Sequence, residues 1–331
     1  MMTTAGTPTY PTYPTYRELL ERKDAPSGSS WYLFGAQDER GMANLITPEA
    51  VQAATACVSR GVSFGLDYPL EAFDPSIAGR TPPHHVMVRS HEDQRDDYLD
   101  GFWPQASSQV DGLRHRRHHE HGFYGGVPDE DVVVGSPTLG VNRWADRPIV
   151  GRGVLIDVEA FRAANGDRID HEAGEHLPVG VLDDTLAWQR SVLQPGDCVL
   201  IRTGWADWYL ETLDHDGREE VCRTQRCTGM EQSHDTLAWL WDYQVGLAAA
   251  DTYAFEALPA RSGSPFGGDT DAGMMHQDLI ALLGLPLGEL WRLRELAEDC
   301  ATSGSYESLL VVKPLNLTGG VGSPANAVAI R

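Results

Sequence analysis

The second half of the chain alternates short apolar segments with segments of helical pattern. RGVLIDVEAF, at 152–161, is typical of a strand that runs into a helix start. A helix, a PGD turn and a strand at 197–203 follow, and a helix from Ser233 to about Tyr243 then precedes a strand at 245–250. The first third of the chain is richer in strands and loops. This order predicts an α/β fold with a mixed β-sheet flanked by helices.

The sequence predicts a single folded domain behind an N-terminal arm. No low-complexity linker follows residue 30, so we assign 30–331 to one catalytic domain. Residues 1–29 are predicted to be a flexible arm, because the tripeptide PTY occurs three times in a row there and proline at every third position favours an extended backbone. The alternative is an arm that wraps a neighbouring subunit through Tyr10, Tyr13 and Tyr16.

Several local signals predict individual elements. Thr47 is placed as an N-cap before a first-turn proline, which predicts a helix from Pro48 to Ser59. Near the C-terminus, His276 and Glu289 are each predicted to open a helix. A strand at 84–90 is predicted to lead into a charged segment that faces solvent.

Composition restricts the partners of the chain. Of its 331 residues 41% are hydrophobic, which is enough for a large core. Its 26 basic and 48 acidic side chains give a net charge of −22, which excludes nucleic acid and anionic membranes as partners because both need a basic surface. The five cysteines form no CxxC pair and no apolar run approaches membrane-spanning length. We therefore expect a cytoplasmic protein that acts on a small molecule.

Four polar residues recur at intervals of four, two and four: Gln105, Gln109, Asp111 and His115. A carboxylate beside an imidazole stabilises the imidazolium and fixes the tautomer, which suits a general base, and either group can instead bind a divalent ion. Asp111 and His115 can meet on one helical face or through a tight turn at Gly112. The competing interpretation is a surface pair, with glutamines that bond to the backbone.

The adjacent run RHRRHHEH holds three further histidines among arginines. His118, His119 and His121 have the spacing of a metal tract, but the neighbouring Arg114 and Arg116 oppose the binding of a cation. Arginines suit a carboxylate, which they can bind through two parallel hydrogen bonds. We interpret the run as a binding site for an anionic substrate or as exposed surface.

The second half of the site is expected far along the chain, at His276 and Glu289. Asp251 is a further candidate because it follows the apolar VGLAAA segment, and α/β proteins present functional groups at the carboxyl ends of strands. Each has a structural alternative: a helix-terminus histidine, a capping glutamate and a turn aspartate. The glycine-rich GGVGSPANA matches no nucleotide-binding loop, and the GxSxG motif of serine hydrolases is absent.

Four blocks of the sequence resemble the cyclase family, which includes bacterial kynurenine formamidase and isatin hydrolase. The blocks are FGAQDERGMANLITPEAV, SSQVDGLRH with FYGG, DTYAFE, and MHQDLIALLGLPLGEL with PLNLTGGVGSPANAVAI. The family signature H-x-G-T-H-x-D-x-P-x-H binds one or two divalent ions. Here it reads Q-x-x-x-Q-x-D-x-L-x-H, similar to a longer subgroup of the family.

The resemblance implies a metal site and a set of residue roles. Its metal ligands correspond to six residues: Gln105, Gln109, Asp111, His115, His276 and Glu289. From the chemistry of the residues themselves, we assign catalytic roles to His115, Asp111 and His276, and substrate contacts to Arg114, His119, His121 and Tyr124. The resemblance also implies one Mn²⁺ or Zn²⁺, a swivelling β/α architecture, and a homodimer or homotetramer.

These residues favour a metal-dependent hydrolase of an amide, lactone or related cyclic carbonyl, with His115 as the proton shuttle. Two alternatives remain open. A metal-independent lyase or cyclase would use His115 and His276 as acid and base. The second alternative is a catalytically inactive ligand-binding protein, because two histidines of the signature are replaced by glutamine.

Overall fold

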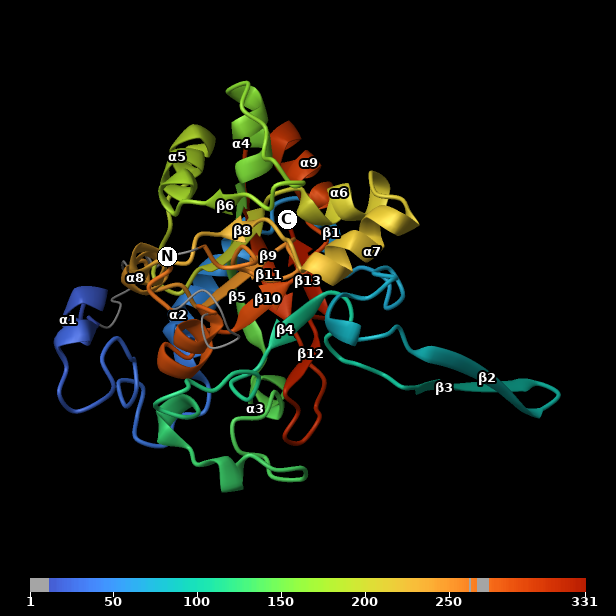
Figure 1. Ribbon diagram of the computed structural model, residues 1–331, viewed down its shortest axis with the longest axis horizontal. Helices are drawn as coiled ribbons and strands as arrows, with labels where there is room; N and C mark the ends of the chain where they lie inside the picture. Colours follow the sequence, from blue (N-terminus) through green and yellow to red (C-terminus); the bar gives the residue numbers. More distant parts are fainter. Residues whose placement is uncertain (1–11, 262, 267–273) are drawn as a thin grey trace, which may run out of the picture.

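The computed structural model describes residues 12–261, 263–266 and 274–331, and a nine-stranded mixed sheet runs through its centre (Figure 1). The strands are β1 Ser63–Gly65, β2 His84–His91, β3 Gln94–Asp100, β4 Gln109–Asp111, β5 Ile149–Asp157, β6 His176–Leu177, β7 Cys198–Arg202, β8 Gly229–Met230, β9 Leu247–Ala250, β10 Leu287–Glu289, β11 Glu307–Val312, β12 Gly322–Pro324 and β13 Ala327–Ile330. The α-helices are α1 Tyr16–Glu21, α2 Pro48–Ala54, α3 Asn142–Asp146, α4 Val158–Ala164, α5 Gly180–Gln189, α6 Trp205–Glu211, α7 His215–Thr224, α8 His234–Asp242 and α9 Arg294–Ser303. A π-helix, η7, spans Gln277–Leu282, and 3₁₀ turns lie at Gly41–Leu45 (η1), Thr55–Cys57 (η2), Ile77–Gly79 (η3), Tyr124–Gly126 (η4) and Asp129–Asp131 (η5).

The sheet has the order β1-β13-β11-β5-β7-β9-β10-β4-β12. Within this sheet the adjacent strands β5, β7, β9 and β10 run parallel to one another. Every other pairing of the nine-stranded sheet is antiparallel. The central apolar runs at 154–156, 199–201 and 248–250 are buried, as expected of parallel strands covered on both faces. The predicted mixed sheet with flanking helices is confirmed.

Part of the segment predicted to be a flexible arm packs against the rest of the chain, from residue 16 onward. α1 begins with a capping box between Thr15 and Glu18. Tyr16 and Leu19 on this helix are buried, and the Tyr16 amide donates to Asp242 at the end of α8 over 2.6 Å. The apolar face of α1 therefore packs within its own chain, as does Tyr13. Tyr10 lies outside the described residues.

The helices predicted to begin at Pro48 and at Glu289 differ in their outcome. Thr47 caps α2 by accepting from the Ala50 amide over 3.2 Å, which confirms the predicted start, although the regular helix ends at Ala54 and continues as η2. Glu289 was predicted to open a helix and instead ends β10. Its backbone is in a strand because β9 and β4 lie on either side of β10 in the sheet.

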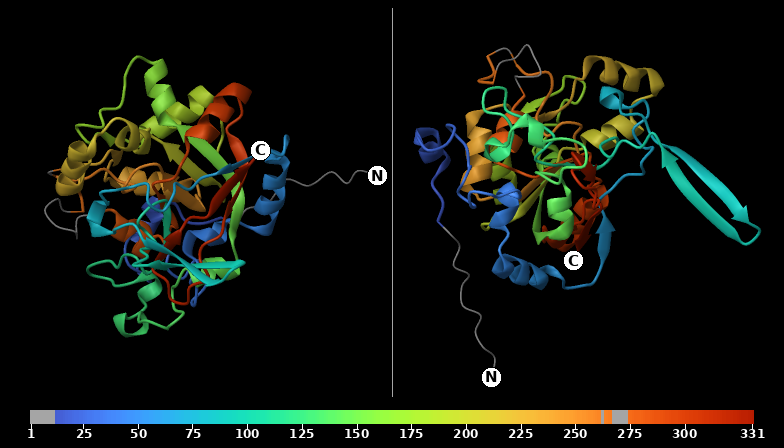
Figure 2. Two further views of the ribbon diagram at one scale, coloured as in Figure 1. Left: turned by 90° about the vertical axis from the view of Figure 1, so that its right-hand side faces the viewer. Right: turned by 90° about the horizontal axis from the view of Figure 1, so that it is seen from below.

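Strands β2 and β3 form a two-stranded hairpin that projects away from the rest of the molecule (Figures 1 and 2). The predicted strand at 84–90 is confirmed, and the charged segment after it forms the second strand of the hairpin. Val86 is half-buried, and the other residues of both strands are exposed.

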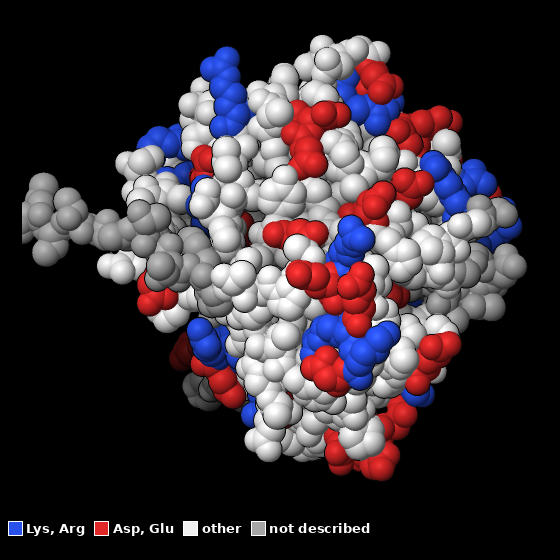
Figure 3. Space-filling model, turned by 90° about the vertical axis from the view of Figure 1, so that its left-hand side faces the viewer, with Lys and Arg blue, Asp and Glu red and all other residues white. Residues whose placement is uncertain are grey.

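Charges are interspersed on the face in Figure 3, where acidic side chains lie beside basic ones. None of the helices in the described ranges is both long and apolar enough to span a bilayer.

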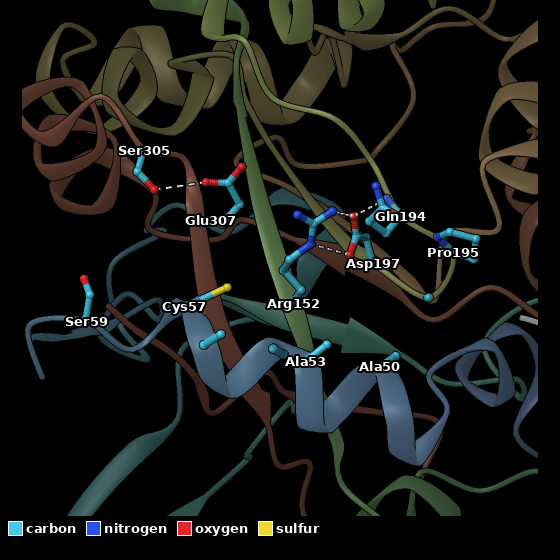
Figure 4. A pocket seen from close by; sticks show the side chains of 13 residues that line it. Ala50, Ala53, Cys57, Ser59, Arg152, Gln194, Pro195, Asp197, Ser305 and Glu307 are labelled. Atoms are coloured by element: carbon cyan, nitrogen blue, oxygen red, sulfur yellow. Dashed lines mark hydrogen bonds and ion pairs between the residues drawn. The ribbon is translucent and has the colours of Figure 1, made fainter. Parts of the chain in front are cut away.

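A cavity of about 490 Å³ lies between α2, β5 and β11, and none of the candidate site residues lines it. The bidentate ion pair of Arg152 with Asp197 lines it together with small side chains of α2 (Figure 4).

Candidate active site

Strand β4 brings the polar series against β10. It pairs antiparallel with β10, and Gln109 lies directly opposite Glu289. Directly opposite residues point to the same face of a sheet, and so do residues two apart on one strand. Asp111, Gln109 and Glu289 therefore share one face, and all three are buried.

His276 reaches this group from the start of η7. Glu256 holds it in place by accepting hydrogen bonds from the His276 amide over 2.8 Å and from the Met275 amide over 2.7 Å. The same carboxylate contacts ring Nδ1 of His276, while Nε2 lies 2.9 Å from Oε1 of Glu289. Ligand atoms of Asp111, His276 and Glu289 all lie within 4.8 Å of one another.

The two glutamines contact the carboxylates of this group. Gln105 donates from Nε2 to Oδ1 of Asp111, and Gln109 donates from Nε2 to Oε2 of Glu289. One oxygen of each carboxylate is thus held by a neutral amide. The other oxygen of Asp111, Oδ2, is buried without a hydrogen-bond partner among the residues the structure describes.

His115 is placed by a turn rather than by a helix. Its amide donates to the Gly112 carbonyl over 2.9 Å. Gly112 has no room for a side chain, since an added Cβ would lie 2.6 Å from the Val321 carbonyl oxygen. The turn places Nε2 of His115 at 3.6 Å from Oδ2 of Asp111. It places Nδ1 of His115 at 3.0 Å from the side-chain nitrogen Nε2 of Gln105.

The electrostatics of the group suit a cation. Burial raises the pKa of Asp111 to about 7, the Glu289 charge adds to the rise, and His276 opposes it. Burial alone would lower the pKa of His276, but hydrogen bonds to Glu256 and Glu289 outweigh it and raise that pKa to about 10. A metal ion would replace the proton that Glu256 and Glu289 stabilise on His276. The neutral imidazole and the two carboxylates, with Oδ2 of Asp111 unpartnered, then form a donor set that fits Zn²⁺ or Mn²⁺.

A cavity of about 150 Å³ opens beside His115, His276 and Glu289. Its other described lining residues include Arg80, Arg116, Tyr253 and Met274. Nη1 of Arg80 lies 3.2 Å from the Gln105 carbonyl oxygen and 3.5 Å from Oε1 of Gln109. The cavity is therefore lined by two guanidinium groups as well as by the Glu289 carboxylate.

The four residues predicted to bind substrate are not brought to this cavity. Arg114 is a correction: its buried guanidinium donates to the backbone carbonyls of Val133, Ser136, Thr138 and Gly319, which uses its hydrogen-bonding capacity. Tyr124 is also a correction, because it is buried and its hydroxyl donates to Asp38 over 2.9 Å.

His118, His119 and His121 also lie outside the described residues that line the cavity. His119 and His121 stack on His118, with ring centroids 4.6 and 4.7 Å apart, and the His119 amide donates to Gln277. Asp251 acts as a turn aspartate, because its carboxylate accepts hydrogen bonds from the backbone amides of Thr203 and Gly204.

Sequence reasoning missed Glu256 and Arg80. Glu256 belongs to the block DTYAFE, one of the four that carry the family resemblance, and this was the signal available for it. Arg80 stands in a segment of loop composition between η3 and β2, where no motif marks it.

Comparisons with known proteins give the family. The model of the Cyclase family matches residues 36–257. A solved structure described as a novel cyclase is 33% identical, with 92% of this chain and 99% of that chain covered and a TM-score of 0.79. Among curated proteins none matches.

Two isatin hydrolases share the fold at lower identity. Isatin hydrolase A from Labrenzia aggregata, bound to benzyl benzoate, is 14% identical, with 83% of this chain and 94% of that one covered and a TM-score of 0.53. Isatin hydrolase A from Ralstonia solanacearum is 16% identical, with coverage of 86% and 97% and a TM-score of 0.52. From the family match and the 33% identity over nearly the whole length, the chain belongs to the Cyclase family.

Proposed function

We propose that this chain is a metal-dependent hydrolase that opens an amide, lactone or related cyclic carbonyl. The observation that carries the proposal is the buried convergence of Asp111, His276 and Glu289, of which His276 and Glu289 line a cavity. These three residues would hold one divalent ion, Mn²⁺ or Zn²⁺. Such an ion supplies Lewis acidity toward a carbonyl oxygen and lowers the pKa of water.

In this proposal Gln105 and Gln109 orient ligands instead of binding the ion directly. Their amide nitrogens face the carboxylates of Asp111 and Glu289. A side-chain amide that donates to a carboxylate holds its rotamer without adding charge. The six-residue ligand set implied by the resemblance is thereby reduced to three.

His115 carries the proton. It is part of the cavity wall and only partly exposed, and Asp111 on the same turn keeps its ring oriented. In hydrolysis the ring accepts a proton from the attacking water and delivers it to the leaving nitrogen or oxygen. Because Nε2 lies 3.6 Å from Asp111, the resulting imidazolium forms beside a carboxylate that stabilises it.

Substrate recognition is proposed for Arg80 and Arg116 in place of Arg114. Both side chains line the cavity together with His115, His276 and Glu289. A guanidinium there would bind a carboxylate or carbonyl group of the substrate. The two isatin hydrolases of similar fold favour a cyclic amide as the first compound to test.

The test combines metal analysis with a variant of His115. Protein purified without a His-tag should contain about one Mn or Zn per chain, and chelation should abolish hydrolysis of an amide and lactone panel until the metal is restored. His115→Gln should lower kcat by about 10²- to 10⁴-fold while metal content is unchanged. His121→Gln, an exposed histidine of the same run, is the matched control.

Two results would contradict the proposal in favour of its alternatives. Activity that is unaffected by chelation and refilling points to the metal-independent lyase or cyclase. A chain that binds compounds of the panel without any turnover, and whose His115→Gln variant only binds them less tightly, points to a ligand-binding protein.

A further inference from the structure

Tyr253 belongs to the block DTYAFE, in the segment that follows β9. The other polar side chains of this block are hydrogen-bonded within the protein. Asp251 accepts from two backbone amides, Thr252 donates to a backbone carbonyl over 2.8 Å, and Glu256 holds His276. The Tyr253 hydroxyl makes no hydrogen bond with any residue that the structure describes. It is therefore the one polar group of the block that has no structural task.

The ring of Tyr253 is held by packing, while its hydroxyl is accessible. The side chain is half-buried and packs against a cluster of buried residues that includes Phe73 and Leu290. The hydroxyl oxygen is not one of the fully buried, unpartnered polar atoms of the described chain, so it is open to solvent. Tyr253 lines the same cavity as His276 and Glu289. A fixed ring with a free donor is preorganised toward a molecule bound in that cavity.

Backbone hydrogen bonds connect the segment around Tyr253 to the end of β10, where Glu289 lies. The Leu290 amide donates to the Thr252 carbonyl over 2.9 Å, and the Phe255 amide donates to Oε1 of Glu289 over 3.3 Å. These two bonds lie on either side of Tyr253 in sequence. The position of Tyr253 relative to the carboxylate of Glu289 is thus set by the backbone.

The surroundings of Tyr253 keep its hydroxyl protonated at neutral pH. Burial raises the pKa of Tyr253, Arg80 opposes the rise, and the charge of Glu289 adds to it. A protonated phenol donates a hydrogen bond and carries no charge. Tyr253 can therefore stabilise a negative oxygen in the cavity without repelling a cation bound nearby.

We propose that Tyr253 is a further catalytic residue, whose hydroxyl donates a hydrogen bond to the oxygen of the substrate carbonyl under attack. This role rests on the hydrolysis proposed above. As water attacks, a C–O bond forms, the electron pair of the C=O double bond moves to the oxygen, and His115 takes a proton from the water. The Tyr253 hydrogen bond strengthens as negative charge grows on that oxygen. The C=O bond then forms again, the bond to the leaving nitrogen or oxygen breaks, and His115 protonates the leaving atom. The Tyr253 proton stays on its own oxygen throughout.

Tyr253→Phe tests this role because it removes the hydroxyl and keeps the ring. On the panel compound that the parent hydrolyses fastest, kcat should fall by about 10²- to 10³-fold, while KM and metal content stay those of the parent. A loss in kcat with KM unchanged is expected of an interaction made only in the transition state.

Tyr68→Phe is the matched control, because it makes the same change beside the same cluster. Tyr68 packs against Phe73 with ring centroids 5.4 Å apart, and its hydroxyl donates to Asp207 over 3.2 Å. Tyr68 is not one of the residues that line the cavity, so this variant should keep the kcat of the parent.

Failure of this inference differs from failure of the proposed hydrolysis. If the parent hydrolyses the panel and responds to chelation, but Tyr253→Phe has the same kcat, only the role of Tyr253 is overturned. It is also overturned if Tyr253→Phe raises KM alone, or if its loss of activity comes with loss of metal or of the far-UV circular dichroism of the parent. A parent that hydrolyses nothing in the panel overturns the proposed function, and with it this inference.

Discussion

Glu256 lies behind His276 and fixes its orientation through the backbone and the ring together. It accepts from the amides of Met275 and His276 and contacts Nδ1, which directs Nε2 at Glu289. Metal-binding histidines commonly have their second nitrogen held by a carboxylate, which raises the basicity of the ligand. Gln232 donates to Oε2 of Glu256, so both oxygens of this carboxylate accept hydrogen bonds within the core.

Glu256→Gln should weaken the metal site without unfolding the chain. The glutamine keeps the shape but loses the negative charge beside Nδ1, and its amide group faces N–H donors. We expect metal affinity to fall by about 10- to 100-fold, as measured by competition with a chromogenic chelator. Glu231→Gln, which affects a neighbouring ion pair with Arg261 near the surface, is the control. Equal affinity in the two variants would show that Glu256 has no such role.

The residues of the candidate site were predictable to different degrees. Asp111 belongs to a regular polar series, and the resemblance supplied His276 and Glu289. Only its place in the block DTYAFE marks Glu256, because 20 positions separate it from His276 and the fold brings their atoms together. The sequence favours Arg114, which follows the polar series, over Arg80, which no motif marks. The structure reverses this order, because four backbone carbonyls bind the Arg114 guanidinium away from the cavity.

At the scale of elements, η1 and the end of η7 are locked together through two glycines. The Met42 amide donates to the Gly284 carbonyl over 2.8 Å, and Gly41 itself has a φ of +59°. A Cβ on Gly41 would lie 1.9 Å from that carbonyl oxygen. Because η7 begins beside His276, this contact supports the position of the site from the opposite end of the helix.

Gly41→Ala should therefore be strongly destabilising. The backbone carbonyl of Gly284 cannot move away as a flexible side chain can, so we expect a loss of at least about 3 kcal/mol in the free energy of unfolding by urea. Gly61→Ala is the matched control. Its φ is +71°, but nothing lies within 4 Å of an added Cβ, and it should cost only about 1–2 kcal/mol. Similar losses in both would mean that the close contact adds nothing.

Elements with strong local signals were predictable and short ones were not. Ser233 caps α8 as the pattern indicated, and the apolar strands β5, β7 and β9 lie close to their predicted positions. β10 has only three residues and no periodicity, so its strand state follows from the neighbours that pair with it. β3 is rich in acidic residues, and its strand state follows from its pairing with β2.

At the scale of the whole molecule, the proposed metal joins three segments that are far apart in sequence. Asp111 comes from β4, His276 from the start of η7 and Glu289 from β10. An ion that binds only the folded chain stabilises it by about 2.7 kcal/mol when its concentration is 100 times the dissociation constant. No periodicity in the sequence indicates this convergence, because it depends on the order of strands in the sheet.

Removal of the metal should lower the melting temperature of the whole chain. We expect chelation to reduce Tm by about 4 °C, measured by differential scanning calorimetry. In Asp111→Asn, which lacks one of the three proposed ligands, chelation should leave Tm unchanged. A drop of the same size in this variant would place the stabilising ion elsewhere.

The position of β13 has a consequence for how the chain is made. This strand lies between β1 and β11, although it follows every other strand in sequence. During synthesis β1 emerges early and has no place in the sheet until residues 327–330 have been translated. Because β13 pairs with β1 on one side and with β11 on the other, β1 joins the sheet only after β13 is in place. A chain in which β13 is displaced therefore leaves the edge of β11 unpaired, and such an edge can pair with other chains.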